Sequence, residues 1–141
     1  MKIDGVKMKM TQLWDKDKVI PVTIIKVINK ETFSSENLEK GDIVAVSGRS
    51  KGRGFQGVVK RHGFHGGPQT HDQKNRLRAP GSIGATAPQR VIKGKKMAGH
   101  MGNRLVTIKK MKIVEVKPEE GILVVKGAIP GSTGGKIKIS K

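Results

Sequence analysis

Both ends of the chain alternate apolar and polar residues in the manner of short β-strands. Val6, Met8 and Met10 alternate with lysines near the start, and Ile137 and Ile139 do so near the end. A period of two places every second side chain on the same face of a strand. Further runs rich in β-branched residues extend over Val19–Ile28, Ile43–Ser47, Leu105–Lys117 and Ile122–Lys126. Helical periodicity is weak throughout, so the sequence predicts a mostly β fold built around a small antiparallel β-barrel.

The longest of these runs, Leu105–Lys117, does not fit one ideal strand. Its apolar phase shifts twice, once before Met111 and once before Val114. A shift of one residue moves the apolar side chains to the other face of a strand. The run therefore predicts a β-bulge or a change of strand partner. The residues that follow it, Lys117–Gly121, have the composition of a hairpin connection.

The middle of the chain, Gly48–Arg104, shows neither pattern. It has few apolar residues and contains Gly and Pro throughout. A compact domain seldom includes some fifty residues without regular structure. Two interpretations remain open: disorder, or an arm that becomes ordered against a polyanion. The predicted domains are a barrel from residues 1–47 and 105–141 and a Gly-rich basic extension from residues 48–104.

Charge supports this division and narrows the classes of function. The 141 residues include 29 basic and 11 acidic ones, a net charge of +18, and no cysteine. Residues 48–114 contain 16 basic residues and one acid, whereas residues 1–47 and 115–141 are nearly neutral. Without cysteine there is no disulfide, thiolate zinc site or Cys nucleophile. Neither a membrane helix of ~20 residues nor the apolar core of a signal peptide is evident, so we expect a cytoplasmic protein with a polyanionic partner.

Three motifs suggest other chemistry, and each lacks a required part. Gly52–Gly57 matches GxGxxG, but neither a sufficient helix nor an acid about 20 positions on follows, as dinucleotide binding requires. The histidines that precede Asp72 lack the cysteines that structural zinc sites usually include. Ser82 resembles a nucleophile elbow only loosely, and its segment supplies one acid for a triad. The sequence thus predicts no enzyme, no metal and no cofactor.

The basic residues of the middle segment are the stronger candidates for function. Arg grips phosphates and base edges, Lys supplies a compact charge, and His rings stack on bases or donate to phosphates. No amphipathic helix is present to lie on a membrane or to enter the major groove of DNA. Irregular folded RNA fits a Gly-rich basic arm better. The candidate RNA-binding residues are Arg49, Lys51, Arg53, Lys60, Arg61, His62, His65, His71, Lys74, Arg76, Arg78, Ser82, Arg90, Lys93, Lys95, Lys96, His100 and Arg104.

The chain also contains four long motifs, Ser47–Arg61, Arg78–Gly84, Lys93–Gly102 and Leu123–Gly131. In residues and order they resemble the universal large-subunit ribosomal protein L-three family, in its bacterial form. Met10–Gln12 and Ile20–Thr23 resemble the amino-terminal strands of that family. The resemblance covers most of the chain.

This resemblance implies a β-barrel of the translation-protein type with a long extension that penetrates the large-subunit rRNA. Gly48–Arg104 would be the extension, and Pro80–Arg90 would lie in its deep part, toward the peptidyl-transferase region. The family contributes to assembly of the large subunit and performs no chemistry. The implied partners are large-subunit rRNA and neighbouring large-subunit proteins, and the implied location is the cytoplasmic ribosome.

The chain departs from the family pattern at two places. Lys7–Met10 lacks the glycine that the family has before its Met-Thr-Gln motif. Only Asn29–Asn37 bridges a gap that the family fills with barrel strands and a helical insertion. An edge opened by this shortening could be covered by rRNA, by a neighbouring protein or by a second copy. The alternative functions are a reduced or engineered barrel that folds alone or as a homodimer, and a general RNA chaperone.

Overall fold

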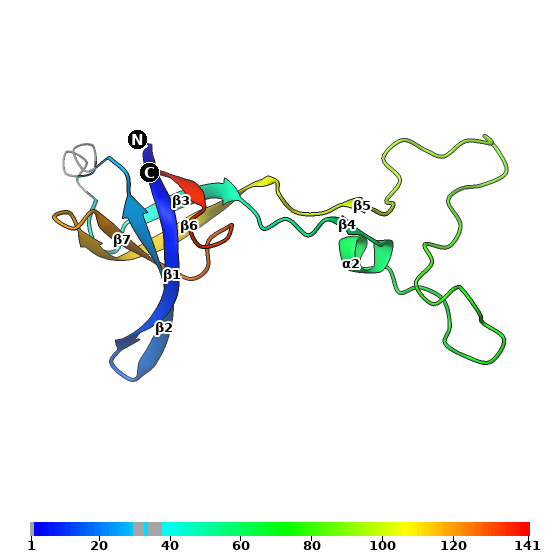
Figure 1. Ribbon diagram of the computed structural model, residues 1–141, viewed down its shortest axis with the longest axis horizontal. Helices are drawn as coiled ribbons and strands as arrows, with labels where there is room; N and C mark the ends of the chain where they lie inside the picture. The colour runs from blue at the N-terminus through cyan, green and yellow to red at the C-terminus, as the bar shows by residue number, and fades with distance from the viewer. Residues whose placement is uncertain (1, 30–32, 34–37) are drawn as a thin grey trace. The chain divides into compact units, whose positions relative to one another are not determined.

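The computed structural model describes residues 2–29, 33 and 38–141, and its regular structure is mostly β (Figure 1). Each strand-like run of the sequence lies in or overlaps one of its strands, so the mostly β prediction is confirmed. The elements are β1 (Ile3–Asp15), β2 (Lys18–Val27), β3 (Ile43–Arg49), β4 (Phe55–Gln56), α2 (Val58–His62), β5 (Gly99–His100), β6 (Leu105–Lys117), β7 (Ile122–Lys126) and β8 (Lys136–Ser140).

The chain divides into two compact units. The sheet unit comprises Met1–Lys51 and Asn103–Lys141, and the glycine-rich unit comprises Gly52–Gly102. These boundaries differ by a few residues from those expected after residues 47 and 104, because strand pairing continues further. Arg49 still lies opposite Leu105, and just beyond them the N–H of residue 50 donates to the carbonyl of residue 104 at 2.9 Å.

Six strands of the sheet unit pair antiparallel in an order that closes on itself. The order is β1-β2-β7-β6-β3-β8, and β8 pairs back to β1 with Ile139 opposite Ile3. Each of these strands has a partner on both sides, so the described sheet leaves no open edge. The shortening therefore opens no edge among the described strands, so the condition under which the sequence allowed a homodimer is not met. The short bridge Asn29–Asn37 lies mostly outside the described residues, although Phe33 within it is buried in the core.

The core is aliphatic and lies inside the closed sheet. Alternate residues of β8 are buried: Ile137 and Ile139 are 2% and 1% exposed, and the flanking lysines are exposed. Such alternation is what a strand with one face inward requires. Phe33 is the one aromatic residue of this core within the described part of the chain. The core comprises Ile3, Ile25, Val27, Phe33, Leu38, Val44, Val46, Met111, Ile113, Leu123, Val125, Ile129, Ile137 and Ile139.

β6 contains two irregularities, as its shifting apolar phase predicts. Against β3, the pairing shifts where Lys109 and Lys110 together oppose the single Ala45. Against β7, the pairing shifts between Ile113 and Glu115. An extra residue in one strand restores the inward direction of the apolar residues on both sides of it. The predicted bulge is therefore confirmed.

β1 buries the face opposite to the one that its apolar residues indicate. Ile3, Gly5 and Lys7 are buried, whereas Met8 and Met10 are exposed. The pairing of β1 with β2 shifts between Lys7 and Met10. The alternation of apolar residues with lysines thus predicts the strand correctly, but an inward direction for the methionines would be wrong.

Lys7 is a buried cation that fastens the loop before β8 to β1. Its Nζ donates to the carbonyl oxygens of Ile129 and Gly131, each at 2.8 Å. Its backbone N–H donates to the carbonyl of Gly135 at 2.9 Å. Burial lowers the pKa of Lys7, and the positive charge of Lys51 lowers it further. Because a buried ammonium is costly unless its protons are accepted, these carbonyls determine where the loop lies.

Candidate nucleic-acid interface

The glycine-rich unit has almost no core of its own. Val58 is its one buried residue, 3% exposed, and α2, β4 and β5 are its regular elements. The hydrophobic contribution to stability grows with the apolar area removed from water. This unit therefore gains little from packing, and its shape depends on hydrogen bonds and on glycine backbone.

β4 and β5 bring the two ends of the unit together. They pair antiparallel with Phe55 opposite His100, and nearby the Arg53 N–H donates to the carbonyl of Met101 at 2.9 Å. The side-chain amide of Gln56 donates to the Arg53 carbonyl. Phe55 is 75% exposed, so it offers an aromatic face on which a base can stack. The charge-based prediction omits Phe55, because one Phe in a sequence carries no sign of its exposure.

α2 directs two of its basic residues toward the unit's own backbone. The helix ends at Gly63, which has the left-handed φ of 74°. Nη1 of Arg61 donates to the carbonyl of Met97 at 2.6 Å, and Nε2 of His62 lies 3.0 Å from the same oxygen. An added Cβ at Gly99 would lie 2.7 Å from Nη1 of Arg61, so glycine makes room for the guanidinium. Arg61 and His62 thus have a structural contact that the sequence pattern does not indicate.

The loop between Gly67 and Arg76 is closed by a hydrogen bond of the glycine backbone. The N–H of Gly67 donates to the carbonyl of Arg76 at 3.0 Å. Gly66 has φ +79°, and an added Cβ there would overlap the carbonyl oxygen of Leu77. Only glycine allows so close an approach at this φ. Basic side chains of the loop, among them that of Arg76, are left exposed.

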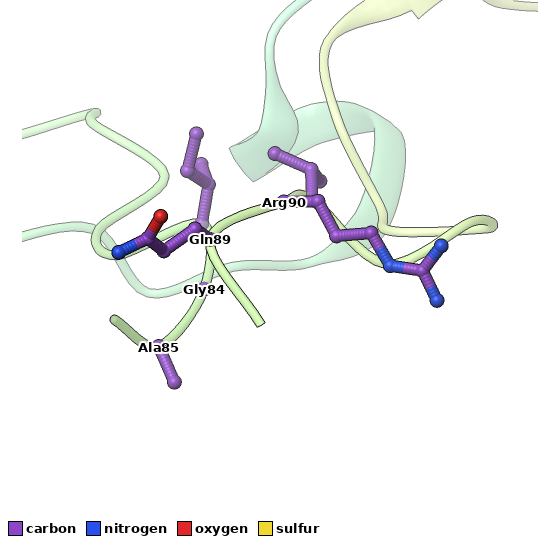
Figure 2. Close-up of a pocket in the computed structure, with 6 residues that line it drawn as sticks. Gly84, Ala85, Gln89 and Arg90 are labelled. Atoms are coloured by element: carbon purple, nitrogen blue, oxygen red, sulfur yellow. The ribbon is translucent and has the colours of Figure 1, made fainter. Parts of the chain in front are cut away.

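The loop of residues 82–91 borders a shallow, open hollow of about 220 Å³. In Figure 2 the Gln89 amide and the Arg90 guanidinium, both at this hollow, point in opposite directions. Oγ of Ser82 donates to the carbonyl of Gly84 at 3.0 Å and accepts from its N–H at 3.4 Å. These contacts are those of a turn-forming serine. The hollow is lined by Ile83, Gly84, Ala85, Gln89, Arg90 and Val91.

The glycine-rich unit is also strongly electropositive. It contains ten basic residues and one acid, Asp72. None of the ten forms an ion pair with a described residue, because the two described pairs, Lys117–Glu115 and Lys141–Asp42, lie in the sheet unit. So many like charges favour an anionic partner. Its predicted RNA-binding residues, all at least partly exposed, are Arg53, Lys60, Arg61, His62, His65, His71, Lys74, Arg76, Arg78, Ser82, Arg90, Lys93, Lys95, Lys96 and His100.

Three predicted residues lie in the sheet unit instead: Arg49, Lys51 and Arg104, all exposed. Nη1 of Arg49 donates to the carbonyl and to Oδ1 of Asn103, at 3.2 and 3.3 Å. The N–H of Arg104 donates to Oγ of Ser50 at 3.3 Å. These contacts hold the guanidinium of Arg49 and the backbone of Arg104 in place.

The arrangement offers cations, an exposed aromatic ring and open backbone. In residues 2–29, 33 and 38–141, no three His, Asp or Glu side chains gather as metal ligands. The GxGxxG segment Gly52–Gly57 includes β4 and leads into the five-residue α2, where a dinucleotide site needs a longer helix. Within the same described part, no helix has the length and apolar character to cross a bilayer.

Comparisons with known proteins agree on one family. A family model described as Ribosomal protein L3 matches residues 18–122. A protein named "Large ribosomal subunit protein uL3" from Chlorobium limicola is 48% identical over 122 residues, covering 78% of this chain and 58% of the relative. "Large ribosomal subunit protein uL3c" from Phaeodactylum tricornutum is 45% identical over 134 residues, covering 88% and 64%. The protein from Chloroherpeton thalassium is 44% identical over 137 residues, covering 89% and 66%. The chain spans about half to two thirds of the length of the curated relatives it matches.

Proposed function

Because the chain belongs to the ribosomal protein L3 family, we propose that it is a structural constituent of the large ribosomal subunit that binds large-subunit rRNA. It acts in the ribosome by binding and carries out no chemical reaction. Its closed sheet is the β-barrel of the translation-protein type, and residues 48–104 are the rRNA-binding extension. Neighbouring large-subunit proteins are its other partners, and it assists assembly of the subunit.

One observation carries the proposal: the ten cations of the glycine-rich unit are all at least partly exposed, none is paired with a described acid, and their backbone buries one side chain. Such a chain gains little stability alone and gains much from neutralisation. Each Lys or Arg that meets a phosphate releases condensed counterions, which favours binding. A segment of this kind becomes ordered, or stays ordered, by lying among RNA strands.

The loop Pro80–Arg90 is assigned to the deep part of the extension, toward the peptidyl-transferase region. The assignment rests on the family resemblance, and the exposure of every residue of this loop supports it. The guanidinium of Arg90 points away from the amide of Gln89 (Figure 2). Because Arg90 is also exposed, its guanidinium is available to a phosphate or a base edge.

The test is the salt dependence of binding between the full chain and transcribed large-subunit rRNA. Binding should weaken steeply as salt rises, with a slope of about 0.7 to 0.9 for each phosphate contact. An extension variant that loses five of these contacts should lose up to ~4 units of that slope. A control variant with the same charge change, made in the sheet unit, should keep the wild-type slope. The extension variant is R76Q/R78Q/K93Q/K95Q/K96Q, and the control is K2Q/K9Q/K16Q/K18Q/K117Q, all at exposed positions.

Three results would refute the proposal. The affinity could be independent of salt, the two variants could lose affinity equally, or the chain could bind small-subunit rRNA of similar length equally well. The last result would instead favour a general RNA chaperone, because a chaperone shows little preference among RNAs.

A further inference from the structure

The sheet unit exposes five lysines on the outside of neighbouring strands. Here Lys109, Lys110, Lys112, Lys136 and Lys138 are named the lysine face; all five are exposed. The first three lie on β6 and the last two on β8, and β3 pairs with both strands between them (Figure 1). Adjacent strands lie about 4.8 Å apart. The outward side chains of β6, β3 and β8 therefore form one continuous surface.

The bulge in β6 places two consecutive lysines on this face. Neighbouring residues of a regular strand point to opposite sides, yet Lys109 and Lys110 are both exposed. On either side of them, Ile108 packs against the core and Met111 is buried. Lys110 adopts φ 58° to make this possible, a conformation that costs a residue with a side chain about 1–2 kcal/mol. Bulges of this kind often re-aim side chains beside a functional surface.

Hydroxyl groups lie at the centre of the lysine face. Ser47 of β3 is opposite Thr107 of β6 on one side and Lys138 of β8 on the other. Oγ of Ser47 and Oγ1 of Thr107 are 2.8 Å apart. Ser and Thr hydroxyls together with Lys are common ligands of RNA and DNA phosphates. The face thus combines the donors that a phosphate backbone needs.

Little negative charge opposes these lysines. Asp4 of β1 lies opposite Lys138, and Asp42, next to the start of β3, is bound to Lys141 at 2.6 Å. No lysine of the face forms an ion pair with a described residue. The face therefore keeps a positive charge, which complements a polyanion.

We propose that the lysine face binds RNA phosphates as a second contact, made by the sheet unit in addition to that of the glycine-rich unit. The proposal rests on the proposed function for the identity of the partner, but it concerns different residues. A solvated lysine surface and a surface for an acidic protein segment are the competing interpretations. Only the proposal predicts that bound RNA protects these five ammonium groups from a chemical reagent.

Lysine footprinting of the unmodified full chain tests this directly. The protein is acetylated briefly with and without saturating large-subunit rRNA, and each lysine is quantified by mass spectrometry. RNA should slow acetylation of the lysine face at least threefold and leave Lys117, at the far end of β6, unchanged. A second arm measures the salt slope of the face variant K109Q/K110Q/K112Q/K136Q/K138Q. It should fall by about 2 or more, since each phosphate contact contributes about 0.7 to 0.9.

The outcomes separate this proposal from the proposed function. If the face stays reactive in the complex while the extension variant loses affinity, the proposal is overturned and the rRNA-binding function stands. If the extension variant binds like the control and the face is unprotected, both fail. Circular dichroism and the urea midpoint of the face variant check its folding, and the footprint needs no substitution.

Discussion

Replacing Lys7 with methionine tests whether a buried cation stabilises the sheet unit. Methionine keeps an unbranched apolar stem of similar length, but it has no N–H to donate. The carbonyl oxygens of Ile129 and Gly131, each 2.8 Å from Nζ in the wild type, then lose their donor. The loop before β8 loses its side-chain attachment to β1.

The magnitude follows from two opposed effects. An unsatisfied buried acceptor costs about 1–3 kcal/mol, which gives about 2–6 kcal/mol for two carbonyls. The substitution also removes the cost of burying an ammonium, which is several kcal/mol per ion, and its repulsion from Lys51. The contact with Gly131 is only partly buried, so water can replace part of it. Because these effects all offset the loss, we expect a net loss at the lower end of that range, about 2 kcal/mol in the free energy of unfolding, or roughly 10 °C in Tm for a unit of this size.

The pH dependence gives this prediction a second measurement. Burial, and then Lys51, lowers the pKa of Lys7 in the folded state, below the ordinary lysine value of about 10.4. The unfolded chain therefore holds this proton more tightly than the folded chain does. A neutral amine still has two N–H groups for the two carbonyls. The stability of the wild type relative to Lys7→Met should thus rise as the pH increases through the folded pKa to above about 10.4.

Urea denaturation followed by circular dichroism measures both effects, with Lys9→Met as the matched control. Lys9 lies two residues further along β1 and is exposed, so its substitution should change the free energy of unfolding by less than about 0.5 kcal/mol. An equal midpoint for the wild type and Lys7→Met at neutral pH would refute the reasoning. The reasoning would also be refuted if the difference in the free energy of unfolding between the wild type and Lys7→Met became smaller as the pH rises.

Three other predictions concern single residues. Gly66→Ala should speed amide exchange in its loop at least tenfold, because the added Cβ overlaps the Leu77 carbonyl at φ +79°; unchanged exchange would contradict this. Lys110→Gly should raise the free energy of unfolding by about 0.5–1 kcal/mol, since glycine accepts its φ of 58° without the strain of a side chain; a lower urea midpoint would contradict it. The Lys141 hydrogen bond lowers the pKa of Asp42, so this carboxylate stabilises the fold above its unfolded pKa of about 3.9 and loses that effect as the pH falls through its lower folded pKa. The advantage of the wild type over Asp42→Asn in urea should therefore vanish in acid, and a constant gap from about pH 7 to pH 2 would argue against it.

Local patterns predicted the strands, but not the faces they bury. The two phase shifts in Leu105–Lys117 predicted a bulge or a change of strand partner, because a strand with a buried face must keep its apolar residues inward, and the strand pairing shifts at two points in this run. The same reasoning fails for β1, where Lys7 is buried and Met10 is 47% exposed. Lys7 occupies the interior because carbonyls from residues 129 and 131 accept its protons. Those residues are more than 120 positions away, and no local pattern contains them.

The residue types of the glycine-rich unit predicted its basic, irregular nature. They did not predict which of its basic side chains contact the backbone of the unit itself. Ten basic residues against one acid indicate a polyanionic partner, and this inference needs only the composition of the unit. Yet Arg61 and His62 both contact the carbonyl of Met97, 35 or more positions along the chain. Two of the predicted RNA ligands thus also maintain the unit that carries the others. The basic side chains that do not contact the unit's own backbone can be identified only after the path of that backbone is known.

Net charge counted along the chain hides charges that strand pairing brings together. Residues 115–141 hold five bases and three acids, and so look nearly neutral. Their acids lie at the β6–β7 hairpin, whereas Lys136 and Lys138 lie on β8. Pairing of β3 with both β6 and β8 then groups these two lysines with the three of β6. Charge counted along the chain predicts RNA binding by one segment only, because each count covers residues that are neighbours in sequence. The strand order shows which lysines are neighbours in space, and it extends the expected RNA contact to both units.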